Sequence, residues 1–343
     1  MAASIPLFDL LEKSSMLCYL KRTPSELKQQ GTKAMIYPEM PESLLASGLQ
    51  IPEKRVRAIL DTDTYNEIDD QFALTFALLA KDKLDLRAVT AAPFFNMHST
   101  GPADGMEKSY QEILKIFSLM NISPEGMVFR GATEYLPAPE TPVESDAARR
   151  IIELAKEAEK DGERLYVLAI GAITNVASAI LMEPEIIKNI VVVWLGGHAF
   201  EWHGKNDEFN LYQDVPAAQV IFDSKVPFIM FPCAMVTDHL LTTEPELRAR
   251  CKDSGKIGEY LYTHTVEEMA LCGHDSRVIW DIVTVAYFVC PEAIKSIIRP
   301  TAKLNADASY DLSDNSRHEM RYAYALNRDI IFKKLFESIA NCC

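Results

Sequence analysis

The sequence lacks paired cysteines, a long hydrophobic run and any repeat or low-complexity tract. Its seven cysteines contain no CxxC spacing, and an odd number cannot all pair within one chain. Apolar runs are shorter than the roughly 18 residues that a membrane-spanning helix needs, and no basic segment precedes an unbroken hydrophobic core at the N-terminus. We therefore predict a reduced, cytoplasmic setting, with neither a signal peptide nor a membrane anchor.

The sequence also has fewer basic than acidic residues. Lys and Arg number 35 against 49 Asp and Glu, which gives a net charge of −14, and no long Lys/Arg stripe interrupts the acidic background. Such a surface repels polyanions, so we predict no nucleic-acid partner and no membrane partner. The length of 343 residues allows one large α/β domain or two of ordinary size.

Short β-branched runs alternate with loops and amphipathic stretches from about residue 55 onward. The runs are residues 55–60, 86–92, 126–131, 164–170, 189–197 and 226–231. This alternation predicts an α/β fold with a Rossmann-like open, mostly parallel sheet and flanking helices. Ligands bind such sheets beyond the carboxyl ends of the strands, so polar residues that follow these runs are candidates for function.

Residues 1–54 do not follow this pattern. Leucines and aromatic residues among charged positions in 7–20 predict a helical segment, and Pro38, Pro41 and Pro52 predict an irregular connector. We expect an N-terminal extension, 1–54, that packs as an extra layer on the domain or on a second subunit, followed by the main domain, 55–343.

Five acidic residues fall within positions 61–70. Asp61 and Asp63 leave the first strand on the same face, and Asp69 and Asp70 stand at the expected start of a helix, where one carboxylate can cap it. Two charges about 4 Å apart repel by roughly 4 kcal/mol at an effective dielectric constant of about 20. Converging carboxylates therefore favour a bound cation, and oxygen-only ligands indicate a hard ion such as Ca²⁺ or Mg²⁺. The alternative is a solvated acidic loop.

Two enzyme classes compete for this segment. Residues 60–64 resemble the first motif of haloacid dehalogenase-type phosphatases, in which Asp61 would be the nucleophile of a Mg²⁺-dependent phosphohydrolase. Such an enzyme also needs a later phosphate-binding Lys and a second acidic pair, for which we find no convincing counterpart. That class does not predict Asp69 and Asp70 so soon afterwards. A noncatalytic nucleoside or sugar binder is a third hypothesis.

The strand followed by D-x-D, a short loop and D-D resembles the N-terminal signature of the nucleoside hydrolase family, the inosine-uridine preferring type. Further matching segments follow in order: 88–90 leading to Asn96, 128–132, 171–177, 195–197, 208–210 and 280–281. The resemblance spans roughly residues 55–340. It implies that 55–343 is a nucleoside hydrolase-like catalytic domain, that the chain is a Ca²⁺-dependent N-ribohydrolase releasing base and ribose, and that it forms a homo-oligomer, either a dimer or a tetramer.

The resemblance also implies roles for individual residues. The implied calcium ligands are Asp63, Asp70, Asp281 and the backbone carbonyl of Ile170. Asp63 would also be the general base that accepts a proton from the attacking water. The implied substrate-binding residues are Asp69, Asn96, Glu208, Asn210 and Trp280. Taken singly, Asp69 is equally suited to cap a helix and Asn96 to form a turn. Asp61 is expected to orient the loop.

The predicted preference for a purine base rests on Trp280. Nonspecific members of the family carry His before the last metal-binding Asp, whereas the purine-preferring type carries Trp, as here. An indole ring donates no catalytic proton at neutral pH but stacks well on a purine. The resemblance therefore implies a purine ribonucleoside substrate. Candidates for the rest of the base site are Phe94, Phe95, His98, Trp202 and His203, and candidate proton donors are His239 and His274.

The chain departs from the family pattern in the loop after Asp63. Where the family has Pro-Gly-x, this chain has residues 64–68, which we call the first-motif loop and which is two residues longer. We expect Asn66 or Glu67 to face the pocket. A further sugar-binding Asn of the family has no clear match here, and Asn206 is a candidate for it.

Overall fold

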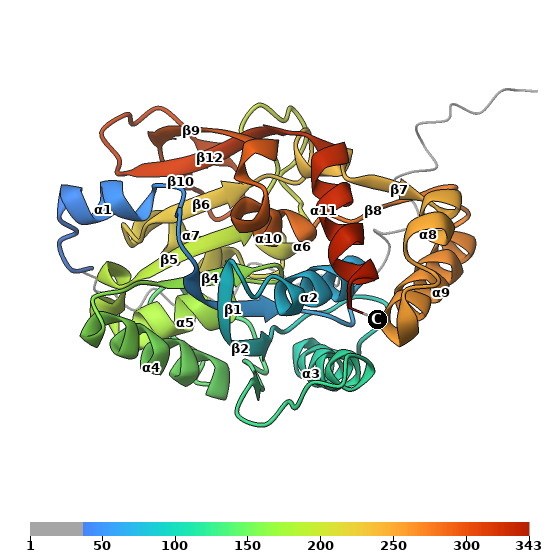
Figure 1. The fold of residues 1–343 in the computed structure, drawn as a ribbon. Helices are drawn as coiled ribbons and strands as arrows, with labels where there is room; N and C mark the ends of the chain where they lie inside the picture. The colour runs from blue at the N-terminus through green and yellow to red at the C-terminus, as the bar shows by residue number, and fades with distance from the viewer. Residues whose placement is uncertain (1–36, 343) are drawn as a thin grey trace, which may run out of the picture.

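The structure is a computed structural model that describes residues 37–342, and its centre is an eight-stranded sheet (Figure 1). The strands lie in the order β3, β2, β1, β4, β5, β6, β12, β9. Their bounds are β1 Val56–Thr62, β2 Leu84–Ala91, β3 Val128–Phe129, β4 Leu165–Ala169, β5 Ile190–Leu195, β6 Phe228–Phe231, β9 Ile294–Pro300 and β12 Glu319–Leu326. Neighbouring strands are parallel except β12 and β9, which pair antiparallel. The predicted Rossmann-like, mostly parallel sheet is confirmed.

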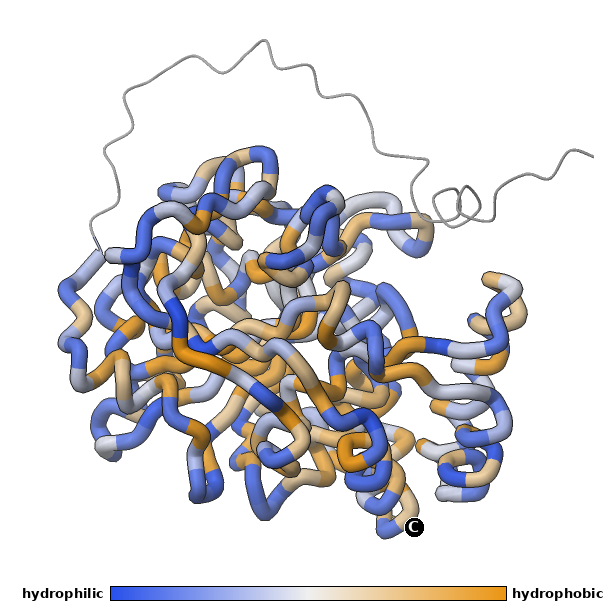
Figure 2. The backbone as a smooth tube through the Cα atoms, turned by 90° about the horizontal axis from the view of Figure 1, so that it is seen from above, coloured by the Kyte–Doolittle hydropathy of each residue, from blue (hydrophilic) through white to orange (hydrophobic). Residues whose placement is uncertain are grey.

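Helices cover both faces of this sheet and enclose two apolar cores. On one face lie α2 (Asp69–Leu79), α3 (Pro102–Leu119), α10 (Ile282–Val289) and α11 (Arg328–Ala340). On the other lie α4 (Asp146–Lys160), α5 (Thr174–Met182) and α7 (Val215–Asp223). Figure 2 shows the hydrophobic stretches in the interior and hydrophilic ones along the outer loops. Among residues 37–342, no helix is both long and apolar enough to cross a bilayer.

The remaining elements are short or peripheral. Helices α8 (Glu244–Arg250) and α9 (Gly255–Cys272) stand to one side of the sheet, next to a small ladder of β7 (Leu241–Thr243) and β8 (Ser276–Val278) (Figure 1). A second ladder joins β10 (Lys303–Leu304) and β11 (Tyr310–Asp311). Helix α6 spans Phe209–Tyr212, and 3₁₀ turns span Pro184–Lys188, Thr237–His239 and Pro291–Ala293.

The N-terminal extension only partly falls within the described residues. Its predicted helical segment, 7–20, lies outside them. In the stretch that we expected to be an irregular connector, residues Glu42–Gly48 form helix α1. Pro41 immediately precedes this helix, where its fixed φ is compatible with a helix start. Arg164 holds α1 to the sheet, since its Nη2 donates to the Leu44 carbonyl and the Ser47 hydroxyl, each at 2.7 Å.

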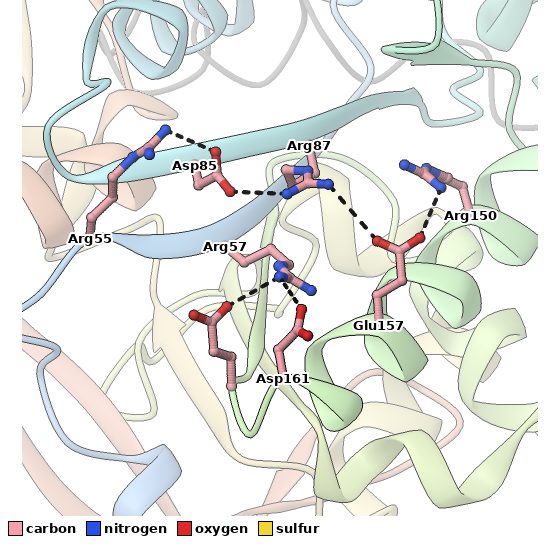
Figure 3. A network of polar contacts seen from close by, with 8 residues as sticks. Arg55, Arg57, Asp85, Arg87, Arg150, Glu157 and Asp161 are labelled. Carbon is pink, nitrogen blue, oxygen red and sulfur yellow. Dashed lines mark hydrogen bonds and ion pairs between the residues drawn. The ribbon is translucent and has the colours of Figure 1, made fainter.

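Cations gather at the amino ends of the first strands. Figure 3 shows this network, in which Arg57 of β1 lies 2.7 Å from Asp161 and 3.3 Å from Glu163. Beside it, Arg87 of β2 contacts Asp85 at 3.2 Å and Glu157 at 4.0 Å. At the opposite, carboxyl end, the same strand β1 leads into the acidic first motif. The strand order also reverses there between β1 and β4, which is where α/β sheets bind their ligands.

Candidate active site

Four carboxylates converge just beyond the carboxyl end of β1. Asp69 and Asp70 form the first turn of α2, and Asp281 immediately precedes α10, so two helix N-termini meet here. One oxygen from each of these three residues lies within 4.8 Å of the others, and all three side chains are buried. Helix N-termini carry partial positive charge, which favours carboxylates at this point. The structure thus joins the predicted ligands Asp70 and Asp281 with Asp69, which we had predicted to bind substrate.

Asp63 completes the cluster and is its least satisfied member. It is 0% exposed, and both of its carboxylate oxygens are buried without a hydrogen-bond partner. Burial, followed by the charges of Asp70 and Asp69, raises the pKa of Asp63 well above its ordinary value. Burial and the neighbouring carboxylates likewise raise the pKa of Asp281. Buried carboxylates in this state require protons or a cation, and an all-oxygen donor set fits a hard divalent ion.

The backbone at Ile170 and Gly171 lies against Asp63. Ile170 follows β4, and its N–H donates to the Asp61 carbonyl at 2.9 Å. A Cβ at Gly171 would stand 3.1 Å from Asp63 Oδ1, so glycine permits this close approach. The Gly171 carbonyl itself accepts from Trp194 Nε1 at 3.1 Å. Ile170 is therefore in the neighbourhood that its predicted role as a carbonyl ligand requires.

Asp61 faces a different set of partners. Its Oδ1 accepts from Thr90 Oγ1 at 2.6 Å and from Asn175 Nδ2 at 2.8 Å. Burial raises the pKa of Asp61 to about 6, against the opposite effect of these hydrogen bonds. Asn175 also bonds the Ala91 carbonyl and the Ala132 N–H, at 3.1 and 2.8 Å. This arrangement favours an orienting role for Asp61 over the nucleophile role of a phosphatase. Sequence reasoning had noted the 171–177 segment but not the function of Asn175.

Glu208 and Asn210 lie just beyond the carboxyl end of β5. Glu208 caps α6, and its Oε2 accepts from the Gly197 N–H at 2.5 Å and from the Leu211 N–H at 2.9 Å. Burial raises the pKa of Glu208, whereas these backbone hydrogen bonds lower it. Asn210 donates from Nδ2 to the Leu195 carbonyl at 3.0 Å. Both predicted substrate-binding residues are thereby fixed to the carboxyl end of β5.

The lengthened first-motif loop contacts a predicted substrate-binding residue. Asn66 is buried, and its Oδ1 accepts from Asn96 Nδ2 at 2.5 Å. The Asn96 Oδ1 in turn accepts from the His98 N–H at 2.8 Å. Asn206, the other candidate, accepts from the His198 N–H at 2.7 Å and donates to the Ala308 carbonyl at 2.9 Å. Its amide is thus already bonded at both ends to backbone groups.

Comparison with known proteins identifies the family of this chain. The sequence model of the inosine-uridine preferring nucleoside hydrolase family matches residues 58–329. The chain belongs to this family. It is therefore a member of a family of hydrolases that act on N-glycosyl compounds, as the sequence resemblance implied.

Two curated relatives are nucleoside hydrolases whose names give a pyrimidine base. The probable uridine nucleosidase 2 of Arabidopsis thaliana is 26% identical over 230 residues, which are 60% of this chain and 68% of that protein. The pyrimidine-specific ribonucleoside hydrolase RihB of Escherichia coli (strain HS) is 27% identical over 146 residues, or 40% of this chain and 45% of that protein.

Two solved structures share the fold. A purine-preferring ribonucleoside hydrolase from Gardnerella vaginalis aligns with a TM-score of 0.67 at 22% identity, covering 83% of this chain and 98% of that one. The plant nucleoside hydrolase PpNRh1 aligns with a TM-score of 0.65 at 20% identity, covering 84% and 99%.

The aromatic residues that we predicted to line the base site lie in different surroundings. Trp280 directly precedes Asp281, is partly buried and has a buried Nε1 without a hydrogen-bond partner. Trp202 is 43% exposed, and its ring lies 5.4 Å from that of His198. Phe94 is fully buried in the core, so packing accounts for it. Trp280 is therefore the aromatic side chain best placed next to the carboxylates.

Gly197 is a residue whose importance the sequence did not reveal. It has φ +75°, and a Cβ there would stand 2.0 Å from the hydroxyl of Tyr310, which reaches this place from β11. Its N–H also holds Glu208, as described above. Glycine is thus required by both conformation and space.

We expect Gly197→Ala to destabilise the protein by more than the about 1–3 kcal/mol of left-handed strain alone, and to lower activity by displacing Glu208. Gly126→Ala is the matched control, since Gly126 has φ +69° but nothing within 4 Å of its Cβ position. Urea denaturation of both variants measures the difference. Equal losses of stability would show that the Tyr310 contact is unimportant.

Proposed function

We propose that this chain is a Ca²⁺-dependent N-ribohydrolase that cleaves the N-glycosidic bond of ribonucleosides, purines preferred, to free base and ribose. The observation that carries the proposal is the buried Asp63 carboxylate, unpartnered at both oxygens, beside the triad of Asp69, Asp70 and Asp281. Family membership supplies the reaction class. The carboxylate cluster supplies a reason for a divalent cation.

The residues proposed to hold this cation are Asp63, Asp70, Asp281 and the carbonyl of Ile170. Carboxylate and carbonyl oxygens are the donors that Ca²⁺ prefers, and Ca²⁺ tolerates the irregular geometry of loop-derived ligands better than Mg²⁺ does. When bound, the cation supplies a Lewis acid that positions and acidifies the attacking water. It also neutralises part of the negative charge that burial makes costly.

The side chains divide the remaining work. Asp63 accepts the proton of the water that attacks the anomeric carbon. The bond from that carbon to the base nitrogen breaks at the same time, and the nitrogen keeps the electron pair and takes up a proton from water. Asp69, Asn96, Glu208 and Asn210 hold the ribose hydroxyls, for which carboxylate and amide oxygens are good acceptors. The sugar gains oxocarbenium character in the transition state, and the surrounding negative charge stabilises it.

The purine preference is proposed on the position of Trp280. An indole ring next to the last carboxylate offers a stacking surface for the base, worth about 1–3 kcal/mol per base when removed. We expect Trp280→Ala to lower kcat/KM for inosine by about tenfold to hundredfold. Trp202→Ala tests in parallel whether the exposed Trp202, the other Trp predicted for the base site, contributes as well.

The activity test uses purified protein with inosine, guanosine, adenosine, uridine and cytidine. Reducing sugar and free base are measured together, with and without added Ca²⁺. We expect equal amounts of both products and the highest kcat/KM for a purine nucleoside. Release from none of the five would refute the proposed activity, and a higher kcat/KM for uridine or cytidine would refute the purine preference alone.

We also propose a cytoplasmic homo-oligomer, a dimer or a tetramer, composed of an N-terminal extension, 1–54, and a catalytic domain, 55–343. The cysteines within residues 37–342 are all free, which supports a reducing compartment. Light scattering on the full chain measures the number of subunits. A variant lacking 1–36 tests whether the extension contributes to assembly.

A further inference from the structure

Arg277 links three separate segments above the carboxylate cluster. It lies in β8, and its Nη2 stands 2.5 Å from Glu67 Oε2 of the first-motif loop and 3.1 Å from Glu268 Oε1 of α9. Arg277 is only 9% exposed. A nearly buried guanidinium with two carboxylate partners is held firmly, because loss of these partners would leave its own buried positive charge uncompensated.

The same guanidinium lies on the proposed base-stacking ring. Arg277 Cζ is 5.0 Å from the centroid of the Trp280 ring, within cation–π distance. Both ion pairs are made by Nη2, and Nε is buried without a hydrogen-bond partner. Arg277 also interacts electrostatically with Asp69. Arg277 therefore contacts the first-motif loop and the Trp280 ring, and it also interacts electrostatically with Asp69 of the carboxylate cluster.

We propose that Arg277 is a positioning residue for the base site, which ties the lengthened first-motif loop through Glu67 to one face of Trp280. This inference rests on the proposed function, in which Trp280 stacks on the base. With the guanidinium on one face, the opposite face of the indole is left for the base. The lengthened loop then supplies the tether, since Glu67 belongs to it and makes the shorter of the two ion pairs of Arg277.

A fixed ring reduces the ordering that substrate binding has to impose. Loss of the tether is therefore expected to raise KM for a purine nucleoside and to change kcat little, because Arg277 does not touch the reacting atoms. We expect Glu67→Gln and Arg277→Gln each to raise KM for inosine about tenfold, the size of one charge-assisted hydrogen bond, with kcat within about twofold. KM for inosine in the double variant should be no higher than in the more impaired of the two single variants. Arg277→Lys should have a lower KM than Arg277→Gln.

The matched control is the ion pair between Arg130 and Glu107. Arg130 Nε lies 2.7 Å from Glu107, and its guanidinium lies 3.8 Å from the Tyr110 ring, so the pair has the same chemistry outside the site. Glu107→Gln and Arg130→Gln should leave KM for inosine unchanged.

Tryptophan fluorescence gives a readout that does not depend on catalysis. The chain has three Trp residues, of which Trp194 is fully buried and Trp202 is exposed. In a Trp202→Phe background, acrylamide quenching therefore reports on Trp280. We expect quenching to increase in Glu67→Gln and in Arg277→Gln, and to stay unchanged in the control pair.

The outcomes separate the two proposals. Unchanged KM and unchanged quenching in folded variants would overturn the tether, as would fully additive effects of the two single changes. If Arg277→Gln fails to fold, Glu67→Gln decides the question, since the Glu67 side chain is 39% exposed and stands in a loop. If the wild-type protein releases no base from any nucleoside, the proposed function fails, and quenching still decides whether Arg277 orders Trp280.

Discussion

Asp63→Asn is expected to abolish turnover while leaving the protein folded. The change removes the proposed general base, worth about 10²- to 10⁴-fold, and at the same time weakens one proposed ligand of the cation. The shape of the side chain is retained. A fall in kcat of at least about 10³-fold is therefore expected for inosine, measured by release of hypoxanthine.

Asp63→Asn should not reduce the stability of the metal-free protein, although it abolishes turnover. Asp63 has no hydrogen-bond partner for either oxygen and is repelled by Asp69 and Asp70. A neutral amide relieves this repulsion, so in the presence of a chelator we expect the variant to be at least as stable as the wild type. Functional sites commonly trade stability for activity in this way.

Asp214→Asn is the control for Asp63→Asn. Asp214 is also a buried carboxylate, whose pKa burial raises to about 6, but it accepts hydrogen bonds from Thr174, Leu136 and Ala217. An amide there loses an acceptor, so this variant should lose about 1–3 kcal/mol of stability and keep its active-site chemistry. Persistent turnover in Asp63→Asn would refute the role of Asp63 as base.

The contrast between Asp63 and Asp214 also shows what sequence can and cannot provide. Local patterns are sufficient for the six predicted strands, since each is a short apolar run that ends at a loop. They also place the acidic motif at the carboxyl end of β1. Whether a given carboxylate has hydrogen-bond donors around it depends on distant segments, and no local pattern encodes that.

The sequence did not predict strands β9 and β12, and their positions also depend on segments that are distant in the chain. Strand β12 pairs with β6, which lies far earlier in the chain, and β9 pairs antiparallel with β12 at the edge of the sheet. Only β9 is an edge strand, since β12 lies between β6 and β9, and in both strands the burial of successive residues alternates only weakly. Tyr310 and Arg277 likewise reach the site from peripheral ladders whose position is decided by tertiary packing.

The first-motif loop was predicted only in outline. Its extra length was evident from the sequence, and so was the expectation that Asn66 or Glu67 faces the pocket. The structure assigns the two residues to different neighbours, Asn96 and Arg277. Asn96 and Arg277 lie 30 and 210 residues further along the chain than their partners in the loop, so tertiary packing decides these contacts.

Removal of the cation with a chelator is expected to abolish activity and to lower the melting temperature more at pH 8 than at pH 5.5. Burial and mutual repulsion raise the pKa values of Asp63, Asp70 and Asp281 in the folded protein. Between the ordinary Asp pKa of about 3.9 and these raised values, the folded state binds more protons than the unfolded state. Stability of the metal-free protein is therefore highest in acid and is lost as the pH rises through this range.

A bound cation takes the place of those protons, so its stabilising effect should grow with pH. At a free Ca²⁺ concentration of 100 times Kd, the gain is about 2.7 kcal/mol. Other buried acids with raised pKa values, such as Asp214 at about 6, owe the shift to their own burial and not to the carboxylate cluster, so they titrate alike with and without the cation. The difference between the two melting temperatures at each pH therefore isolates the carboxylates at the cation.

Titration with Ca²⁺, Mg²⁺ and Zn²⁺ in parallel identifies the ion. We expect Ca²⁺ to restore activity and to give the largest shift in melting temperature, since the donors are all oxygens. Asp70→Asn should reduce that shift more at pH 8 than at pH 5.5, because the raised pKa values of these carboxylates make protons stronger competitors of the cation in acid. A shift of equal size at both pH values would mean that these carboxylates are not where the cation acts.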